Sequence, residues 1–320
     1  MTWQTVSTQA FELGESPFWH PPEHMLYWVD IEAKQIHRLN PLQGGVQSWP
    51  MPSEPGCIAP AVTGGVPSGL VIALRDGIYR AQEWGGALQR LVLADHDIHT
   101  TRFNDGKADP CGRFWAGTMY EPRDTASAQL FSLDCRQGQT PALTSRLAPT
   151  LAPTLTRQAG GATIANGLAW SPDAMTLYWA DTPSHTIRAW DWSSQTNRMS
   201  RERVFKQWPR KPSGWQPGMP GYGGRPDGAA VDVQGNYYVA MFEGARVLKL
   251  SPAGDVLADI AVPAQCPTMP CFGGPDLQTL YLTTVRHKRP AAELQTYPHS
   301  GCVWSMCVDV AGLPVNFFQD

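Results

Sequence analysis

The chain has 320 residues, with 25 basic and 28 acidic side chains and a formal net charge of −3. A chain of this length can bury a large core in one domain or two. No basic stripe stands out, so we expect no nucleic-acid partner. No apolar run reaches roughly eighteen residues, and the N-terminus lacks the regions of a signal peptide. We therefore expect no membrane contact and a soluble, cytoplasmic protein.

Glycine, proline and tryptophan are abundant, with 30, 29 and 13 residues, and long helical patterns are missing. This composition indicates many turns and aromatic strands, and it favours an all-β chain. The seven cysteines contain no CxxC pair, and the eight histidines form no HxH or HExxH motif. We expect reduced cysteines, and a histidine-built zinc site has little support.

The first repeated pattern joins two distant segments, GESPFWHPPEHMLYWVD (14–30) and ANGLAWSPDAMTLYWAD (165–181). Each places a polar residue, Glu15 or Asn166, twelve positions before a tyrosine that opens a Tyr-Trp-x-Asp strand. Alternation and turn chemistry predict strand, turn and strand in both segments. We expect the Tyr-Trp pairs to be core residues.

A second pattern joins NDGKADPCGRFWAGT (104–118) and DGAAVDVQGNYYVAM (227–241). Asn104 and Asp227 each stand five residues before an aspartate and ten before an aromatic residue. Asn-Asp-Gly and Pro-Asp-Gly are also ordinary turn sequences, so we interpret the first as a turn and a site together. The later aspartates are expected to be turn acids within the units: Asp109 and Asp232.

Two weaker copies complete the series. The segment 269–284 has Met269 at the site position, and the segment 57–74 is degenerate and carries no acid at its start. Such units cannot bury their apolar faces alone, and about six of them around a channel make a β-propeller. An open β-sandwich would explain the strands but not the repeated polar residue. We predict a single six-bladed β-propeller domain over residues 1–320.

The repeated polar position predicts a central site. The innermost strand of each blade lines the axis, so Glu15, Asn104, Asn166 and Asp227 should face one point. Two carboxylates and two carboxamides are costly to gather without a compensating charge, and a hard cation such as Ca²⁺, Mg²⁺ or Mn²⁺ suits them. Asn166-Gly167 is also a hairpin dipeptide, but the following LAWSPD does not resemble a tight return strand.

Four segments resemble the SMP-30/gluconolactonase family, the regucalcin, luciferin-regenerating-like and sugar-lactonase group. The resemblance runs from about Phe11 to Val285 and implies a six-bladed propeller with one divalent metal. Members similar to this chain hydrolyse sugar-acid lactones such as gluconolactone, xylonolactone or arabinonolactone. The segments are LGESPFW at 13–19, RFNDGKADPCGRFWAGTM at 102–119, IANGLAWSPD at 164–173 and PDGAAVD at 226–232.

The resemblance also implies roles for individual residues. The metal ligands would be Glu15, Asn166 and Asp227, with Asp227 also the catalytic acid/base. The metal would be Ca²⁺ first, with Zn²⁺, Mg²⁺, Mn²⁺ or Fe²⁺ as alternatives. Substrate contacts would fall on three residues, of which Glu121 rests on the resemblance alone and Arg102 could instead be a solvated surface charge. The three residues are Arg102, Asn104 and Glu121.

Two other functions stay open at this point, a phosphotriesterase- or aryl-esterase-like hydrolase and a non-catalytic calcium-binding propeller. Two segments depart from the family pattern. We interpret 143–161, with its duplicated Ala-Pro-Thr-Leu, as a blade-linking insertion, and 206–226 as a mobile Trp/Gly/Pro cover over the entrance. The partner would be a small sugar lactone, and the chain a monomer or weak homo-oligomer.

Overall fold

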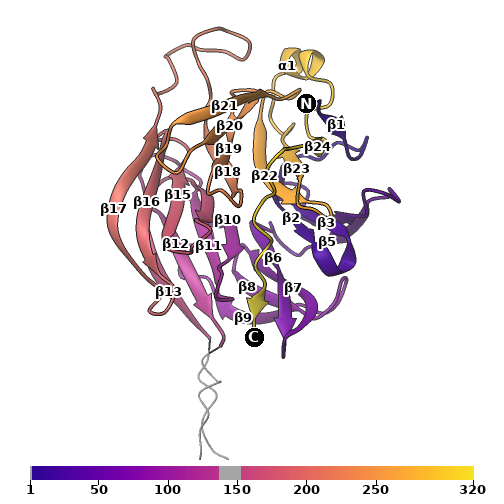
Figure 1. Cartoon of the computed structure of the whole chain (residues 1–320), viewed down its shortest axis with the longest axis vertical. Coiled ribbons are helices and arrows are strands. Elements are labelled where there is room, and N and C mark those ends of the chain that lie inside the picture. Colours follow the sequence, from indigo (N-terminus) through magenta and orange to yellow (C-terminus); the bar gives the residue numbers. More distant parts are fainter. Residues whose placement is uncertain (1, 137–152) are drawn as a thin grey trace, which may run out of the picture.

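The computed structural model describes residues 2–136 and 153–320. Its strands form six sheets, and the chain passes through them in order around the molecule, from indigo to yellow in Figure 1. The first strands of the six sheets pack against one another in a closed ring around the axis. The predicted all-β, six-bladed propeller is confirmed.

The strands of the first three blades follow, from the axis outward. Blade one contains β2 (Gly14–His20), β3 (Met25–Asp30), β4 (Gln35–Leu39) and β5 (Gln47–Pro50). Blade two contains β6 (Cys57–Thr63), β7 (Val66–Leu74), β8 (Gly77–Ala81) and β9 (Gln89–Leu93). Blade three contains β10 (Thr101–Ala108), β11 (Phe114–Tyr120), β12 (Ala128–Asp134) and β13 (Thr154–Ala162).

The other three blades repeat this order. Two short helical elements interrupt the strands: a 3₁₀ turn η1 (Pro21–Glu23) between β2 and β3, and a helix α1 (Ala291–Thr296) between β23 and β24. Blade four contains β14 (Ala165–Trp170), β15 (Thr176–Asp181), β16 (Thr186–Ser193) and β17 (Arg198–Gln207). Blade five contains β18 (Arg225–Val231), β19 (Tyr237–Phe242), β20 (Arg246–Leu250) and β21 (Val256–Ala261). Blade six contains β22 (Pro267–Gly273), β23 (Thr279–Thr284), β24 (Trp304–Cys307) and β1 (Gln4–Thr5).

Both ends of the chain fasten the ring. The N-terminal β1 pairs antiparallel with β24, so the first segment of the chain completes the last blade. The C-terminal segment crosses from blade six to blade two, where β25 (Phe318–Gln319) pairs parallel with β6 (Figure 1). On the way, the Leu313 amide donates to the Val231 carbonyl of blade five at 3.0 Å.

Aromatic side chains fill the spaces between neighbouring sheets. Trp28, Trp115 and Trp179 are among the largest fully buried side chains, and Tyr27 and Tyr178 are also buried. The Tyr-Trp pairs are therefore core residues, as the repeat predicts. Burying such large apolar surfaces is the main stabilising contribution to a fold built from strands alone.

The two turn acids lie where the repeat places them. Asp109 Oδ1 accepts hydrogen bonds from the amides of Cys111 and Arg113, at 2.7 and 3.0 Å. Asp232 Oδ1 accepts in the same way from the amides of Gln234 and Asn236, both at 2.9 Å. Each carboxylate closes the turn between the first two strands of its blade.

One of the two departing segments has a different role from the predicted one. Residues 154–162 form β13, the outer strand of blade three, so interpreting this part of 143–161 as a linking insertion is wrong. Residues 143–152 of that segment lie outside the described residues.

The other departing segment lies between β17 and β18. Residues 208–224 form no strand, but Trp215 is buried and the Tyr222 hydroxyl lies 2.7 Å from His185 Nε2 on blade four. The segment is therefore anchored to the propeller body at these points.

The remaining compositional expectations concern cysteines and membrane spans. All seven cysteines lie in the described part of the chain and are free, as expected. Within residues 2–136 and 153–320, no helix has the length and apolar character needed to cross a membrane.

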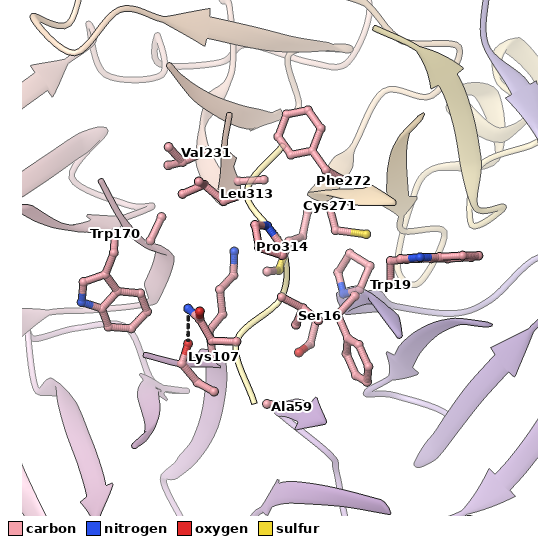
Figure 2. A pocket seen from close by; sticks show the side chains of 18 of the residues that line it. Ser16, Trp19, Ala59, Lys107, Trp170, Val231, Cys271, Phe272, Leu313 and Pro314 are labelled. Atoms are coloured by element: carbon pink, nitrogen blue, oxygen red, sulfur yellow. Dashed lines mark hydrogen bonds between the residues drawn. The ribbon is translucent and has the colours of Figure 1, made fainter. Parts of the chain in front are cut away.

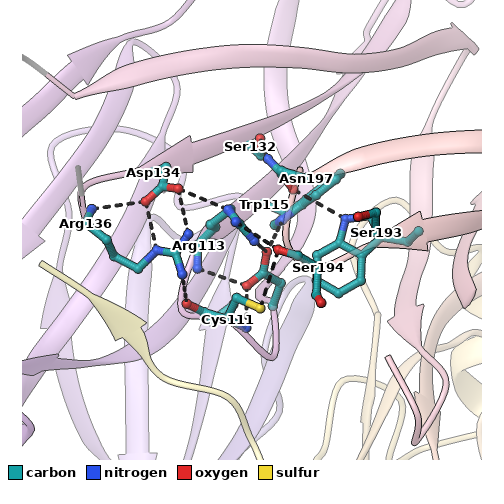
Figure 3. Close-up of polar contacts among 12 residues, drawn as sticks. Cys111, Arg113, Trp115, Ser132, Asp134, Arg136, Ser193, Ser194 and Asn197 are labelled. Atoms are coloured by element: carbon teal, nitrogen blue, oxygen red, sulfur yellow. Dashed lines mark hydrogen bonds and ion pairs between the residues drawn. The ribbon is translucent and has the colours of Figure 1, made fainter. Parts of the chain in front are cut away.

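A network of charges ties blade three to blade four (Figure 3). Arg113 and Arg136 both bind the Asp134 carboxylate, with N···O distances of 3.0 and 2.7 Å, and Arg113 Nη2 donates to the Ser194 carbonyl at 3.0 Å. Partial burial alone would raise the pKa of Asp134, but the hydrogen bonds and charges of Arg136 and Arg113 outweigh it and lower the pKa to about 2. The folded state therefore favours the ionised carboxylate.

We expect Asp134→Asn to lower the melting temperature at pH 7, and to lower it less at pH 3. A carboxylate with a depressed pKa stabilises the fold above its unfolded pKa of about 3.9, and this contribution is lost as the pH falls toward about 2. Thermal unfolding of both proteins at the two pH values measures the difference. Asp124→Asn, at an exposed aspartate, is the control; an equal deficit at both pH values would contradict the assignment.

Candidate active site

The innermost strands carry a bulge at the positions that the repeat singles out. The ladder between first and second strands shifts register between Glu15 and Phe18, Phe103 and Gly106, Asn166 and Ala169, and Pro226 and Ala229. Bulges re-aim side chains and are frequent near active sites. Asn-Asp-Gly, Asn-Gly and Pro-Asp-Gly thus belong to bulged strands, and interpreting any of them as a turn is wrong.

The bulges present the polar residues at two adjacent positions instead of one. Glu15 and Asn166 are the last paired residues before the bulge, whereas Asn104 and Asp227 are the first unpaired ones. Gly167 follows Asn166 with a φ of 60°, and a Cβ there would lie 2.3 Å from the Tyr237 hydroxyl. Both the backbone conformation and the space therefore require glycine.

Hydrogen bonds bring three predicted site residues together across two blades. Arg102 Nη1 donates to Asn104 Oδ1 at 2.7 Å, and Asn104 Nδ2 donates to Asn166 Oδ1 at 2.9 Å. Asn166 Nδ2 donates in turn to Thr182 Oγ1 at 2.8 Å, which fixes the amide with its oxygen toward Asn104. Arg102 is only 5% exposed, so its interpretation as a solvated surface charge is wrong.

Two acids complete the group. Glu15 and Asp227 are 7% and 5% exposed, and neither forms an ion pair with a described residue. Burial, followed by the charges of Asp227 and Asp105, raises the pKa of Glu15. Burial also raises the pKa of Asp227; the charge of Arg225 opposes this and that of Asp105 adds to it. The charges of Arg102 and Arg225 act on these acids only from beyond ion-pair distance, so neither carboxylate has a direct cationic partner among the described residues.

The donor set suits an oxygen-preferring cation. In residues 2–136 and 153–320, no group of three or more His, Cys, Asp or Glu side chains is placed to hold a metal. Glu15 and Asp227 instead supply two carboxylates, and Asn166 supplies an amide oxygen. Hard divalent cations take such ligands, and the cation would provide the charge that the two acids lack.

Glu121 differs from the buried group in being partly exposed and held by an arginine. Its two oxygens each accept a hydrogen bond from Arg75 at 3.0 Å, and its side chain is 37% exposed. The hydrogen bonds from Arg75 lower the pKa of Glu121, and the charge of Arg102 contributes less. Arg75 also binds Glu54 at 3.0 Å. A sugar that bonded to Glu121 would therefore have to share it with Arg75.

Comparison with the sequences of known protein families matches residues 13–286 to the family described as the SMP-30/Gluconolactonase/LRE-like region. The chain belongs to this family.

Named members of the family resemble the whole chain. A 6-deoxy-6-sulfogluconolactonase of Pseudomonas putida is 40% identical over 317 residues, covering 99% of this chain and 98% of the relative. A pentonolactonase of Haloferax volcanii is 34% identical over 290 residues, covering 89% and 85%. A calcium-binding protein, regucalcin, from Agrobacterium tumefaciens has the same fold, with a TM-score of 0.85, 22% identity, and coverage of 100% and 98%.

A cavity of about 280 Å³ lies farther along the channel of this family member (Figure 2). Its lining residues follow the polar positions along the innermost strands, and the C-terminal segment 313–316 closes part of it. The lining is mostly apolar, with Lys107 pointing into it. The cavity contains none of the six predicted site residues, so we do not assign the chemistry to it.

Sequence reasoning missed two residues around the site. Thr182 orients Asn166 and also donates to the Pro226 carbonyl at 2.8 Å, next to Asp227; nothing in the repeat marks it. Arg225 could have been found, because it precedes Asp227 by two positions as Arg102 precedes Asn104.

Proposed function

We propose that this family member is a metal-dependent hydrolase that opens sugar-acid lactones. The observation that carries the proposal is the pair of buried, unpaired carboxylates, Glu15 and Asp227, beside an amide oxygen and a buried arginine. The names of two relatives, a sulfogluconolactonase and a pentonolactonase, support lactones as the substrate class. Gluconolactone, xylonolactone and arabinonolactone are candidate substrates.

Glu15, Asn166 and Asp227 would hold one divalent cation, with Ca²⁺ first among the candidates. When bound, the cation would supply Lewis-acid stabilisation of negative charge on oxygen. The calcium-binding title of the regucalcin structure supports the choice of ion.

The chain's own residues perform the proton transfers and the charge stabilisation. The oxygen of a water molecule bonds to the lactone carbonyl carbon, and Asp227 accepts a proton from that water. Arg102 and Asn104, fixed by their mutual hydrogen bond, bind the oxygen on which negative charge develops. The bond from that carbon to the ring oxygen then breaks, Asp227 returns the proton to the ring oxygen, and a hydroxy acid leaves. Glu121 would accept hydrogen bonds from sugar hydroxyls at the rim.

A lactone panel tests this proposal. Metal-stripped protein would be reconstituted with Ca²⁺, Zn²⁺, Mg²⁺ or Mn²⁺ and assayed against aldonolactones, a phosphotriester and an aryl ester, with spontaneous hydrolysis subtracted. Metal-dependent turnover of an aldonolactone, above that of the two other ester classes, is the expected result. Preference for the phosphotriester or aryl ester would replace the proposal, and no turnover with any ion would leave a non-catalytic propeller.

We expect Arg102→Ala to reduce kcat/KM for the lactone by about 10–100-fold, the usual cost of a lost bond to a charged group. A fall in kcat would place the contact in the transition state, and a rise in KM alone would place it in the ground state. Steady-state kinetics and a metal titration measure both effects. Because Arg102 bonds Asn104, Arg102→Lys serves as the conservative partner; unchanged kinetics in Arg102→Ala would remove the residue from the site.

A further inference from the structure

The cavity of about 280 Å³ in the channel is built by the whole ring of blades (Figure 2). The innermost strands of all six blades contribute lining residues: β2, β6, β10, β14, β18 and β22. Voids larger than a water molecule are few in protein interiors, and an apolar cavity of about 150 Å³ already holds benzene. The space is therefore too large for a packing defect and large enough for a small molecule.

The walls of this cavity are mostly apolar. Figure 2 shows Trp170 and Trp19 on opposite sides, with Val231 and Phe272 between them. All four side chains are at least nine-tenths buried. A sugar or its lactone would lose the hydrogen bonds of several hydroxyls to water against such walls without finding new partners. The cavity therefore suits a different kind of molecule from the one proposed for the site of Glu15.

The C-terminal segment 313–316 forms the remaining wall and is held at both ends. The Leu313 amide donates to the Val231 carbonyl at 3.0 Å, and Asn316 Nδ2 donates to the Ala108 carbonyl at 3.2 Å. The segment thus spans from blade five to blade three across the cavity. A molecule inside would lie between this segment and the innermost strands.

Lys107 supplies the cavity with hydrogen-bond donors. Its amine points into the space (Figure 2) and donates one hydrogen bond, to the Ala229 carbonyl at 2.5 Å. An ammonium group has three donors, and Lys107 forms no ion pair with a described residue, so two donors remain for a ligand. The Ser16 and Ser171 hydroxyls, by contrast, already bond to backbone groups beside them.

The surrounding charges favour an uncharged ligand. Asp105 stands two residues before Lys107 on β10, is buried, and has one oxygen, Oδ1, without a partner among the described residues. Its other oxygen accepts a hydrogen bond from the Leu168 amide at 2.9 Å. A carboxylate ligand on Lys107 would approach this acid and would also give up its own hydration. A neutral acceptor oxygen avoids both costs.

We propose that this cavity is a second binding site, for an uncharged molecule that has an apolar ring and one acceptor oxygen bound by Lys107. Concave sites with apolar walls and a few placed polar groups are the usual form of small-molecule sites. The inference goes beyond the proposed function and does not depend on it, because the cavity contains none of the six predicted site residues.

Calorimetric titration with three ring compounds tests the site: acetophenone, which has a neutral acceptor oxygen, ethylbenzene, which has none, and benzoate, which is charged. Acetophenone should bind the wild type more tightly than benzoate does. Lys107→Met keeps the space but removes the donor, so it should weaken acetophenone binding by about 10-fold or more, the usual effect of losing a bond to a charged group. Ethylbenzene binding should be unchanged or tighter.

Two further variants serve as controls. Lys107→Trp should fill the cavity and weaken both acetophenone and ethylbenzene, whereas Lys288→Met, at an exposed lysine, should weaken neither. Retained ethylbenzene binding in Lys107→Met shows that the fold and the cavity persist without the amine, and melting temperatures check the folding of all variants.

Four results would refute the site: no acetophenone binding to the wild type, tighter binding of benzoate, an equal loss of both ring compounds in Lys107→Met, or undiminished binding in a folded Lys107→Trp. The titrations contain no lactone, so any of these results would leave the proposed function untouched. Loss of lactone hydrolysis in the panel described above would likewise leave this cavity site standing.

Discussion

Asp227→Asn is expected to lower kcat for lactone hydrolysis by about 10²–10⁴-fold, the usual contribution of a positioned general base. Asparagine keeps an oxygen at the bulge of β18 but cannot accept a proton from water. Asp227 is buried and forms no ion pair with a described residue, so a neutral amide of similar size should be tolerated. Steady-state kinetics at saturating metal, with occupancy verified by titration, measures the effect.

Two controls separate the loss of the base from other changes. Asp255→Asn alters an exposed acid in the same blade and should leave kcat unchanged. The melting temperature of Asp227→Asn, measured with and without metal, reports on folding independently of catalysis. A kcat within a few-fold of the wild type, in fully metal-loaded Asp227→Asn, would remove this residue as the base.

Metal removal should have the second large effect, and Glu15→Gln should reveal its cause. We expect chelation to abolish activity and to lower the melting temperature of the wild type. A cation at 100 times its Kd stabilises the folded state by about 2.7 kcal/mol. In chelator, Glu15→Gln should be as stable as the wild type or more so, because it removes one of two buried acids that lack a countercharge. With metal present the order should reverse.

Thermal unfolding of both proteins, with chelator and with each divalent ion, measures whether the order of their stabilities reverses. Glu202→Gln, at an exposed glutamate on β17, should follow the wild type in every condition. Full lactonase activity in rigorously metal-free wild type would refute the metal-dependent mechanism. A Glu15→Gln protein that gains as much stability from the ion as the wild type would remove Glu15 from the ligand set.

Much of the fold follows from spacing alone. Glu15 and Asn166 recur at twelve residues before a tyrosine, and Asn104 and Asp227 recur at ten before an aromatic residue. The ladder registers explain why the two spacings differ: the polar residues occupy adjacent bulge positions, and the aromatic residues pair at different places, Tyr27 with Phe18 but Phe114 with Ala108. Local turn chemistry, by contrast, misled the interpretation of Asn-Asp-Gly (104–106) as a turn, because the same residues that favour tight turns also accommodate a bulged strand.

The sequence by itself determined the all-β class, the six units, the turn acids and the four repeated polar positions (15, 104, 166 and 227), because strand alternation and repeated spacing are local properties of the chain. Only the tertiary structure decided which side chains meet. Asn104 contacts Asn166 across 62 positions, and Arg80, deep in blade two, binds Asp320 across 240. Likewise, Arg75, Glu54 and Glu121 come from three separate segments and meet in two ion pairs. Their charges pair only because the fold brings these segments together, and nothing in the order of the residues along the chain predicts those pairs.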